Sequence, residues 1–170
     1  MKQAYLKTII LLTIGLLCGF ITSLSAQIYW QGGASEDWHD EDNWSSNTVP
    51  GPGDDVIIPS GAGTIYYEIS EEVESVEIGE KSKLVITEGA ELYVAGNFRF
   101  GLRVYGTLEN HGFLFITDIV HFGLDLKRGG LVEHYGQMKV KAIDRYGIYS
   151  YGNFVTYKGS SIAIGIFNIG

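Results

Sequence analysis

Short triplets whose first and third residues are apolar recur along the chain after residue 27. In each of six triplets the first and third residues are apolar, and in four of them the middle residue is charged. This alternation is typical of a β-strand with one buried and one solvated face. The six triplets are Val76-Glu77-Ile78, Leu84-Val85-Ile86, Leu92-Tyr93-Val94, Leu102-Arg103-Val104, Leu124-Asp125-Leu126 and Met138-Lys139-Val140.

Glycines follow these triplets within a few residues, where a corner of the chain often needs a backbone conformation that glycine adopts easily. The first four triplets begin at residues 76, 84, 92 and 102, a beat of eight to ten residues. Both an antiparallel β-sandwich and a parallel β-helix produce such a beat. The very short strands, and the lack of the Asn-Gly or Asp-Gly pairs that form two-residue hairpins, favour the β-helix.

Three related fragments support a coiled repeat without a fixed period: YGTLENHGFLFI (105–116), YGQMKVK (135–141) and YGNFVTY (151–157). We therefore predict an all-β fold, a short parallel β-helix (β-solenoid) with an N-terminal aromatic cap; the alternative is an antiparallel β-sandwich. The predicted divisions are a signal peptide (1–26), the cap and first strands (27–72) and the coils (73–170).

A β-solenoid has to close both ends, because its terminal coils otherwise expose apolar core and unpaired strand edges. Residues 28–72 can close the N-terminal end, whereas the last segment, SSIAIGIFNIG, has no polar or helical cap. Either the last coil pairs with another molecule, which predicts self-association, or the natural product continues beyond residue 170.

Residues 1–26 have the three parts of a secretory signal peptide. Lys2 and Lys7 supply positive charge, residues 8–21 are almost purely apolar, and small residues precede a cleavage point after Ala26. The apolar run is shorter than a membrane span of about 20 residues. We expect an exported protein, extracellular or at the cell surface with the periplasm as an alternative, and no integral membrane span after cleavage. An uncleaved N-terminal anchor is the other alternative.

The charge of the chain from residue 27 onward argues against nucleic acid and anionic membrane surfaces as partners. This part carries ten Lys and Arg residues against twenty Asp and Glu residues, a net charge of −10. Binding to phosphates needs clustered cations, which such a composition does not provide. The same part has no cysteine, so burial and hydrogen bonds have to hold the exported domain together without disulfides.

The stretch Tyr29 to Pro59, YWQGGASEDWHDEDNWSSNTVPGPGDDVIIP, resembles the N-terminal module of large bacterial surface and secreted proteins. Those proteins have a pectate-lyase-like, right-handed parallel β-helix, and the resemblance implies that fold here. The resemblance also implies a secreted or surface-exposed protein, although such proteins are usually much longer. The positions that carry it are Trp30, Gly32, Gly33, Trp38, Asn43, Trp44, Pro50, Gly51, Gly53, Asp54 and Asp55.

Three interpretations of this tryptophan-rich stretch remain open. As a structural cap, its tryptophans would cover the end of the first coil, Gly32 and Gly33 would allow a tight reversal, and Asp54 and Asp55 would cap a turn. As a carbohydrate-binding face, Trp38 and Trp44 would stay exposed and stack on sugar rings. As a Ca²⁺ site, Asp40 and Asp42 would supply oxygen ligands, although the usual Asp-x-Asp-x-Asp-Gly frame is missing. We expect no cofactor, with Ca²⁺ as the alternative.

Several residues in the coils are candidates for binding or catalysis. Tyr149 and Tyr151 lie in a tyrosine-rich region that could bind a ligand laterally. A polysaccharide lyase or hydrolase would need paired carboxylates or Ca²⁺-binding acids beside a basic residue. Six residues offer those groups without forming a recognisable motif: Asp118, Asp125, Lys127, Arg128, Asp144 and Arg145.

These observations favour a non-enzymatic, exported β-solenoid that acts as a structural or adhesion-type interaction module. Its partners would be an extracellular glycan or another protein. A carbohydrate-binding module is the main alternative, and a polysaccharide lyase or hydrolase is the third.

Overall fold

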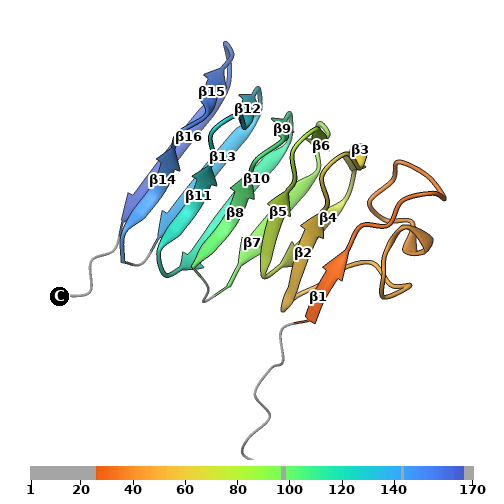
Figure 1. Cartoon of the computed structure of the whole chain (residues 1–170). Helices are drawn as coiled ribbons and strands as arrows, with labels where there is room; N and C mark the ends of the chain where they lie inside the picture. The colour runs from red at the N-terminus through yellow and green to blue at the C-terminus, as the bar shows by residue number, and fades with distance from the viewer. Residues whose placement is uncertain (1–25, 97–98, 143, 167–170) are drawn as a thin grey trace, which may run out of the picture.

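The computed structural model describes residues 26–96, 99–142 and 144–166. All of the predicted signal peptide except Ala26 lies outside these ranges, and so do the last four residues of the chain. The described part is an all-β parallel solenoid of about five turns. Figure 1 shows its coils stacked side by side from the N-terminal loops to the last strands.

Each coil contributes one strand to each of three sheets. Sheet 1 consists of β1 (Ala26–Tyr29), β2 (Asp54–Ile58), β5 (Ser75–Ile78), β8 (Phe100–Val104), β11 (Phe122–Leu126) and β14 (Tyr146–Ser150). Sheet 2 consists of β3 (Gly63–Tyr67), β6 (Ser82–Ile86), β9 (Thr107–Asn110), β12 (Leu131–His134) and β15 (Asn153–Thr156). Sheet 3 consists of β4 (Ser70–Val73), β7 (Glu91–Ala95), β10 (Phe113–Ile119), β13 (Gln137–Ala142) and β16 (Ser161–Ile166).

The ladders between the named strands are all parallel, which confirms the predicted β-solenoid and excludes the antiparallel β-sandwich. The first complete coil, β2 to β4, spans residues 54–73. It therefore lies within the segment that the sequence assigns to the cap and first strands.

The core is built from the first and third residues of the apolar triplets, as predicted. All twelve first and third residues of the six triplets are at most 2% exposed. The parallel register pairs apolar residues of consecutive coils, so that Val76 stacks on Leu102 and Leu102 on Leu124. Each strand therefore continues an apolar row that runs along the solenoid axis, and burial of these rows drives folding.

The corners between sheets bring consecutive coils so close that several of them require glycine. At the corner between sheets 1 and 2, a Cβ on Gly106 would clash with the carbonyl oxygens of Gly79 and Ser82. At the corner between sheets 2 and 3, a Cβ on Gly136 would clash with the carbonyl oxygen of Gly112. Neither glycine has a positive φ, so the need is for space rather than for an unusual backbone conformation.

The two ends of the solenoid differ. At the N-terminal end, β1 pairs with the edge of β2, and the backbone around Asp37 forms a parallel bridge to Tyr66 of β3. At the other end β14, β15 and β16 are the outermost strands of their sheets in the part of the chain that the structure describes. Among the described residues, the last coil therefore presents three unpaired strand edges, whereas two of the three N-terminal edges are covered.

The close approach at the corners predicts a large penalty for a single added methyl group. We expect Gly106→Ala to lower the free energy of unfolding by about 2 kcal/mol or more, because two backbone carbonyls would have to move apart. Gly51→Ala is the matched control, since a Cβ there meets nothing within 4 Å. Denaturant unfolding of both variants measures the difference; equal midpoints would contradict the packing argument.

Candidate functional sites at the cap and on the outer face of sheet 1

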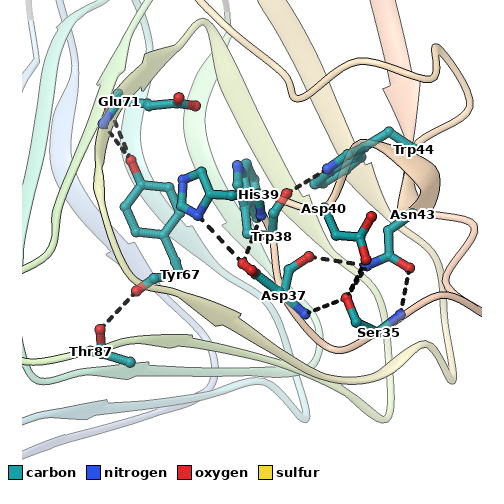
Figure 2. Close-up of polar contacts among 10 residues, drawn as sticks. All are labelled: Ser35, Asp37, Trp38, His39, Asp40, Asn43, Trp44, Tyr67, Glu71 and Thr87. Atoms are coloured by element: carbon teal, nitrogen blue, oxygen red, sulfur yellow. Dashed lines mark hydrogen bonds and ion pairs between the residues drawn. The ribbon is translucent and has the colours of Figure 1, made fainter.

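The three tryptophans form a buried, continuous chain of rings at the N-terminal end. Trp30 packs edge-to-face on Trp44 at 5.0 Å, and Trp44 packs in the same way on Trp38 at 4.7 Å. Trp38 then contacts Tyr67 of the first coil at 5.4 Å, so the chain of rings leads into the core. The indole Nε1 of Trp44 donates to the carbonyl oxygen of Trp38 at 2.6 Å (Figure 2).

The polar residues beside these rings hold the cap loop in shape. Asn43 is fully buried and ends a 3₁₀ turn, η1 (Glu41–Asn43). Its Oδ1 accepts from the amides of Ala34 and Ser35, and its Nδ2 donates to the hydroxyl of Ser35 and the carbonyl of Asp37. Four hydrogen bonds to one buried amide fix the loop over the rings, as Figure 2 shows in part.

Backbone geometry explains the glycines and the aspartates of the predicted cap. Gly32, Gly33 and Gly53 have φ values of 63°, 103° and 87°, a region that favours glycine. Asp54 Oδ2 accepts from the amide of Gly51 at 2.8 Å and so caps the turn before β2. Asp55 Oδ1 accepts from the hydroxyl of Ser75 at 2.5 Å and so ties β2 to β5. The buried Pro50 lies just ahead of that turn.

The carbohydrate-stacking interpretation requires exposed tryptophan rings, and the three rings are buried. Trp38 and Trp44 are 0% exposed and Trp30 is 3% exposed. A sugar stacks on an aromatic ring only where that ring has a face open to solvent. The rings are buried rather than exposed because they pack on one another and on Tyr67 instead of lying side by side on the surface.

The acidic residues of the cap loop bind backbone and hydroxyl groups. Asp40 Oδ1 accepts from the amide of Asp42 at 3.2 Å, and its Oδ2 accepts from the hydroxyl of Ser35 at 2.8 Å. Asp40 thus serves as the N-cap of η1. Among the described residues no group of three or more His, Cys, Asp and Glu side chains is placed to hold a metal ion.

Ion pairs on the outer face of sheet 1 gather around a buried carboxylate. Asp125 is 1% exposed, and its Oδ2 lies 3.0 Å from Arg103 Nε and 2.8 Å from Lys127 Nζ. Arg103 also reaches Glu77, with Nη1 3.4 Å from Oε2. The parallel register places these three strands side by side, so residues 26 and 22 positions apart meet. Asp125 Oδ1 is buried with no hydrogen-bond partner in the described part of the chain.

Aromatic side chains cover the same face near its C-terminal end. Phe122 stacks on Tyr146 at 5.8 Å, and Tyr149 packs at an angle against both. The hydroxyls of Tyr149 and Tyr151 are 2.7 Å apart, and this hydrogen bond raises the pKa of Tyr149. Tyr151 is 63% exposed. The two tyrosines predicted to bind a ligand therefore lie together, with Tyr149 in a packed row and Tyr151 open to solvent.

The catalytic candidates fall into two groups at opposite ends of β11. Asp125 lies within that strand, and Lys127 and Arg128 follow its end. Of the other three, Asp118 lies near the end of β10, the strand before β11, and Asp144 and Arg145 lie in the corner before β14, where Asp144 Oδ2 is 3.8 Å from Arg145 Nε. The structure brings Asp125 and Lys127 together and adds Arg103 and Glu77, which the sequence did not single out. These residues meet through the parallel register of β5, β8 and β11, which the sequence alone does not reveal.

A polar row inside the core crosses sheet 2. Asn110 and His134 are 0% exposed and occupy paired positions of β9 and β12. Asn110 Nδ2 lies 3.1 Å from His134 Nδ1, and His134 Nε2 lies 2.9 Å from the carbonyl oxygen of Ser161. Burial lowers the pKa of His134, and the hydrogen bond to Ser161 opposes that shift only in part. This row ties sheet 2 to β13 and β16 rather than forming a site open to solvent.

Comparisons with protein-family models, with curated proteins and with solved structures give no match for this chain. The class of protein is therefore defined by the fold alone: a parallel β-solenoid with a covered N-terminal end. Among the described residues no helix is long and apolar enough to cross a membrane.

The buried ring chain predicts that cap tryptophans stabilise the fold. We expect Trp38→Ala to lower the free energy of unfolding by about 3–5 kcal/mol, because a fully buried ring leaves a cavity. Tyr66→Ala, at a ring that is 39% exposed on the neighbouring strand β3, should change it by about 0.5 kcal/mol. Thermal and denaturant unfolding of both variants provide the measurement. An unchanged midpoint for Trp38→Ala would refute the structural cap.

The buried His134 predicts acid sensitivity of the fold. Its folded pKa lies below the ordinary value of about 6.5, so the unfolded chain binds a proton at a pH where the folded chain does not. The free energy of unfolding should therefore fall as the pH drops below about 6.5. His134→Asn keeps a polar side chain in the row and should flatten this part of the profile. Identical pH profiles for the two proteins would contradict the assignment.

Proposed function

We propose that the chain is an exported, non-enzymatic structural module that associates through its last coil. The observation that carries this proposal is the difference between the two ends of the solenoid. Trp30, Trp38 and Trp44 are buried at the N-terminal end, whereas β14, β15 and β16 each leave one edge unpaired in the described part of the chain.

The composition of the last coil supports an edge that becomes covered. Proteins keep exposed strand edges from pairing by placing charged residues or prolines on them. The strands β14, β15 and β16 contain neither, and their sequences are YGIYS, NFVT and SIAIGI. Core-row positions of β16 are also open: Ile162 is 36% and Ile164 55% exposed, whereas their counterparts Met138 and Val140 are at most 2% exposed.

A second copy of the chain is the partner that fits this end best. A head-to-tail contact would require a free N-terminal end, but β1 and the cap loop cover two of the three edges there. Two open ends can instead meet about a twofold axis, and the strands across such an interface run antiparallel. This isologous contact closes on itself and buries both apolar ends at once.

Export and the surface or periplasmic setting are supported by the N-terminal sequence. Lys2 and Lys7 precede an apolar run that ends in small residues before Gln27. A non-enzymatic role is supported by the division of the candidate catalytic residues between two ends of β11. It is also supported by the ion pairs that occupy Asp125 Oδ2.

Association through the last coil predicts an oligomer that a charge at the open edge disrupts. We expect light scattering during size-exclusion chromatography to show a dimer whose share rises with concentration. Val155→Lys places a cation on the edge strand β15, where a charge opposes pairing with another strand, so it should convert the dimer to a monomer. The variant should stay folded, because the cation lies beside Glu133 at the paired position of β12. Tyr66→Lys, at the same outer row but at the capped end, is the matched control. A wild-type protein that stays monomeric at every concentration would overturn the proposal.

A further inference from the structure

A second feature of sheet 1 lies away from the open end and is independent of association. Next to the cap, the outer face of β1, β2, β5 and β8 is hollowed over a volume of about 300 Å³. Small-molecule sites in proteins begin at about this size. The hollow forms because the large Phe100 and Arg103 of β8 stand beside the shorter Asp55 and Ser75 of β2 and β5.

Arg103 forms one wall of the hollow and is held in a fixed orientation. Its guanidinium carbon lies 3.6 Å from the centre of the Phe100 ring. Its Nε and Nη1 groups contact the carboxylates of Asp125 and Glu77, respectively. A guanidinium has five N–H donors in one plane, so Arg103, a lining residue of the hollow, has N–H groups beyond those that contact Asp125 and Glu77. Such a preorganised donor costs little entropy when a ligand binds.

Acceptors and an apolar surface complete the lining. Glu77, another lining residue, uses Oε2 for Arg103, so its Oε1 is a further acceptor. Gln27 accepts from the Tyr29 hydroxyl through Oε1, which leaves its amide NH₂ group as a second donor. Phe100 and Ile57 provide the apolar part of the lining. Donors, acceptors and apolar surface thus converge on one small volume.

The chemistry of this lining excludes several classes of ligand. Asp55 and Glu77 would repel an anion, and a cation or metal ion would have to compete with Arg103, which already pairs with Glu77. A peptide cannot add as a strand, because β2 is already paired on both sides by β1 and β5. A neutral molecule with adjacent hydroxyl groups fits, since each hydroxyl can donate to a carboxylate and accept from a guanidinium. Its C–H face would pack on the apolar part of the lining.

We infer that this hollow is a binding site for a neutral saccharide, one sugar residue in size. The residues that bind it are Gln27, Glu77, Phe100 and Arg103. None of them belongs to the tryptophan or tyrosine groups that the sequence suggested as a carbohydrate face. The site does not depend on association through the last coil, because β14 to β16 contribute no residue to it.

The test is an NMR titration of the isotope-labelled full chain with separate probes. Glucose, galactose, mannose and N-acetylglucosamine are the neutral probes, glucuronate is the anionic probe and 1,4-diaminobutane the cationic one. We expect saturable shifts of the Gln27 and Arg103 side-chain signals for at least one neutral probe, with a dissociation constant in the millimolar range. Glu77→Gln and Phe100→Leu should each weaken that binding about tenfold, which corresponds to 1.4 kcal/mol.

Two matched controls separate this site from a general loss of structure. Glu133→Gln and Phe113→Leu make the same changes on the outer faces of sheets 2 and 3, and they should leave the affinity unchanged. Circular dichroism checks that all four variants are folded. The inference is overturned if no neutral probe gives saturable shifts. It is also overturned if glucuronate or the diamine binds instead, or if the controls weaken binding as much as the site variants.

Discussion

The close approach of consecutive coils is the constraint on which the rest of the structure depends. Parallel strands in a ladder lie about 4.8 Å apart, and at the corners the backbone of one coil meets the next with no room for a side chain. Glycines such as Gly106 and Gly136 meet this requirement. Once the corners stack, each side chain lies directly above its counterpart in the preceding coil, and the rows along the axis follow. Core, outer face and edges are all consequences of that stacking.

The sequence predicted the rows but not their register. Apolar triplets reveal an inward face because alternation is a local property, and all six triplets line the core. The loose repeat has a structural explanation: Tyr105-Gly106 lies at the corner between sheets 1 and 2, and Tyr135-Gly136 at the corner between sheets 2 and 3. In both pairs the two amides converge on one carbonyl of the coil below, that of Ile78 or Asn110. One turn type at two corners therefore gives a recurring dipeptide without a constant period.

The candidate sites were harder to predict because they depend on contacts between coils. From β2 onward, the strands of sheet 1 begin at residues 54, 75, 100, 122 and 146, so the coils differ in length. Without a constant coil length, nothing in the sequence aligns Glu77 with Arg103 or Arg103 with Asp125. For the tryptophans the sequence left a structural cap and a binding face open, because only three-dimensional packing shows whether rings contact one another or solvent. Here they contact one another.

Polar residues of the inner rows bond within the core, whereas those of the outer rows face solvent, so a ligand site would lie on the outside. Inner rows accept polar residues only where these bond to one another or to backbone, as Asn110 and His134 do. Some outer charges are paired between neighbouring coils: Lys83 of β6, for example, forms an ion pair with Glu109 of β9, which also contacts His111. That pairing lowers the pKa of Glu109 although its partial burial acts to raise it. The hollow beside Phe100 differs because Asp55 and Ser75 are shorter than Phe100 and Arg103 of the neighbouring coil. The outer face changes its height where such residues lie side by side, so binding capacity on this fold arises where residue size changes between neighbouring coils.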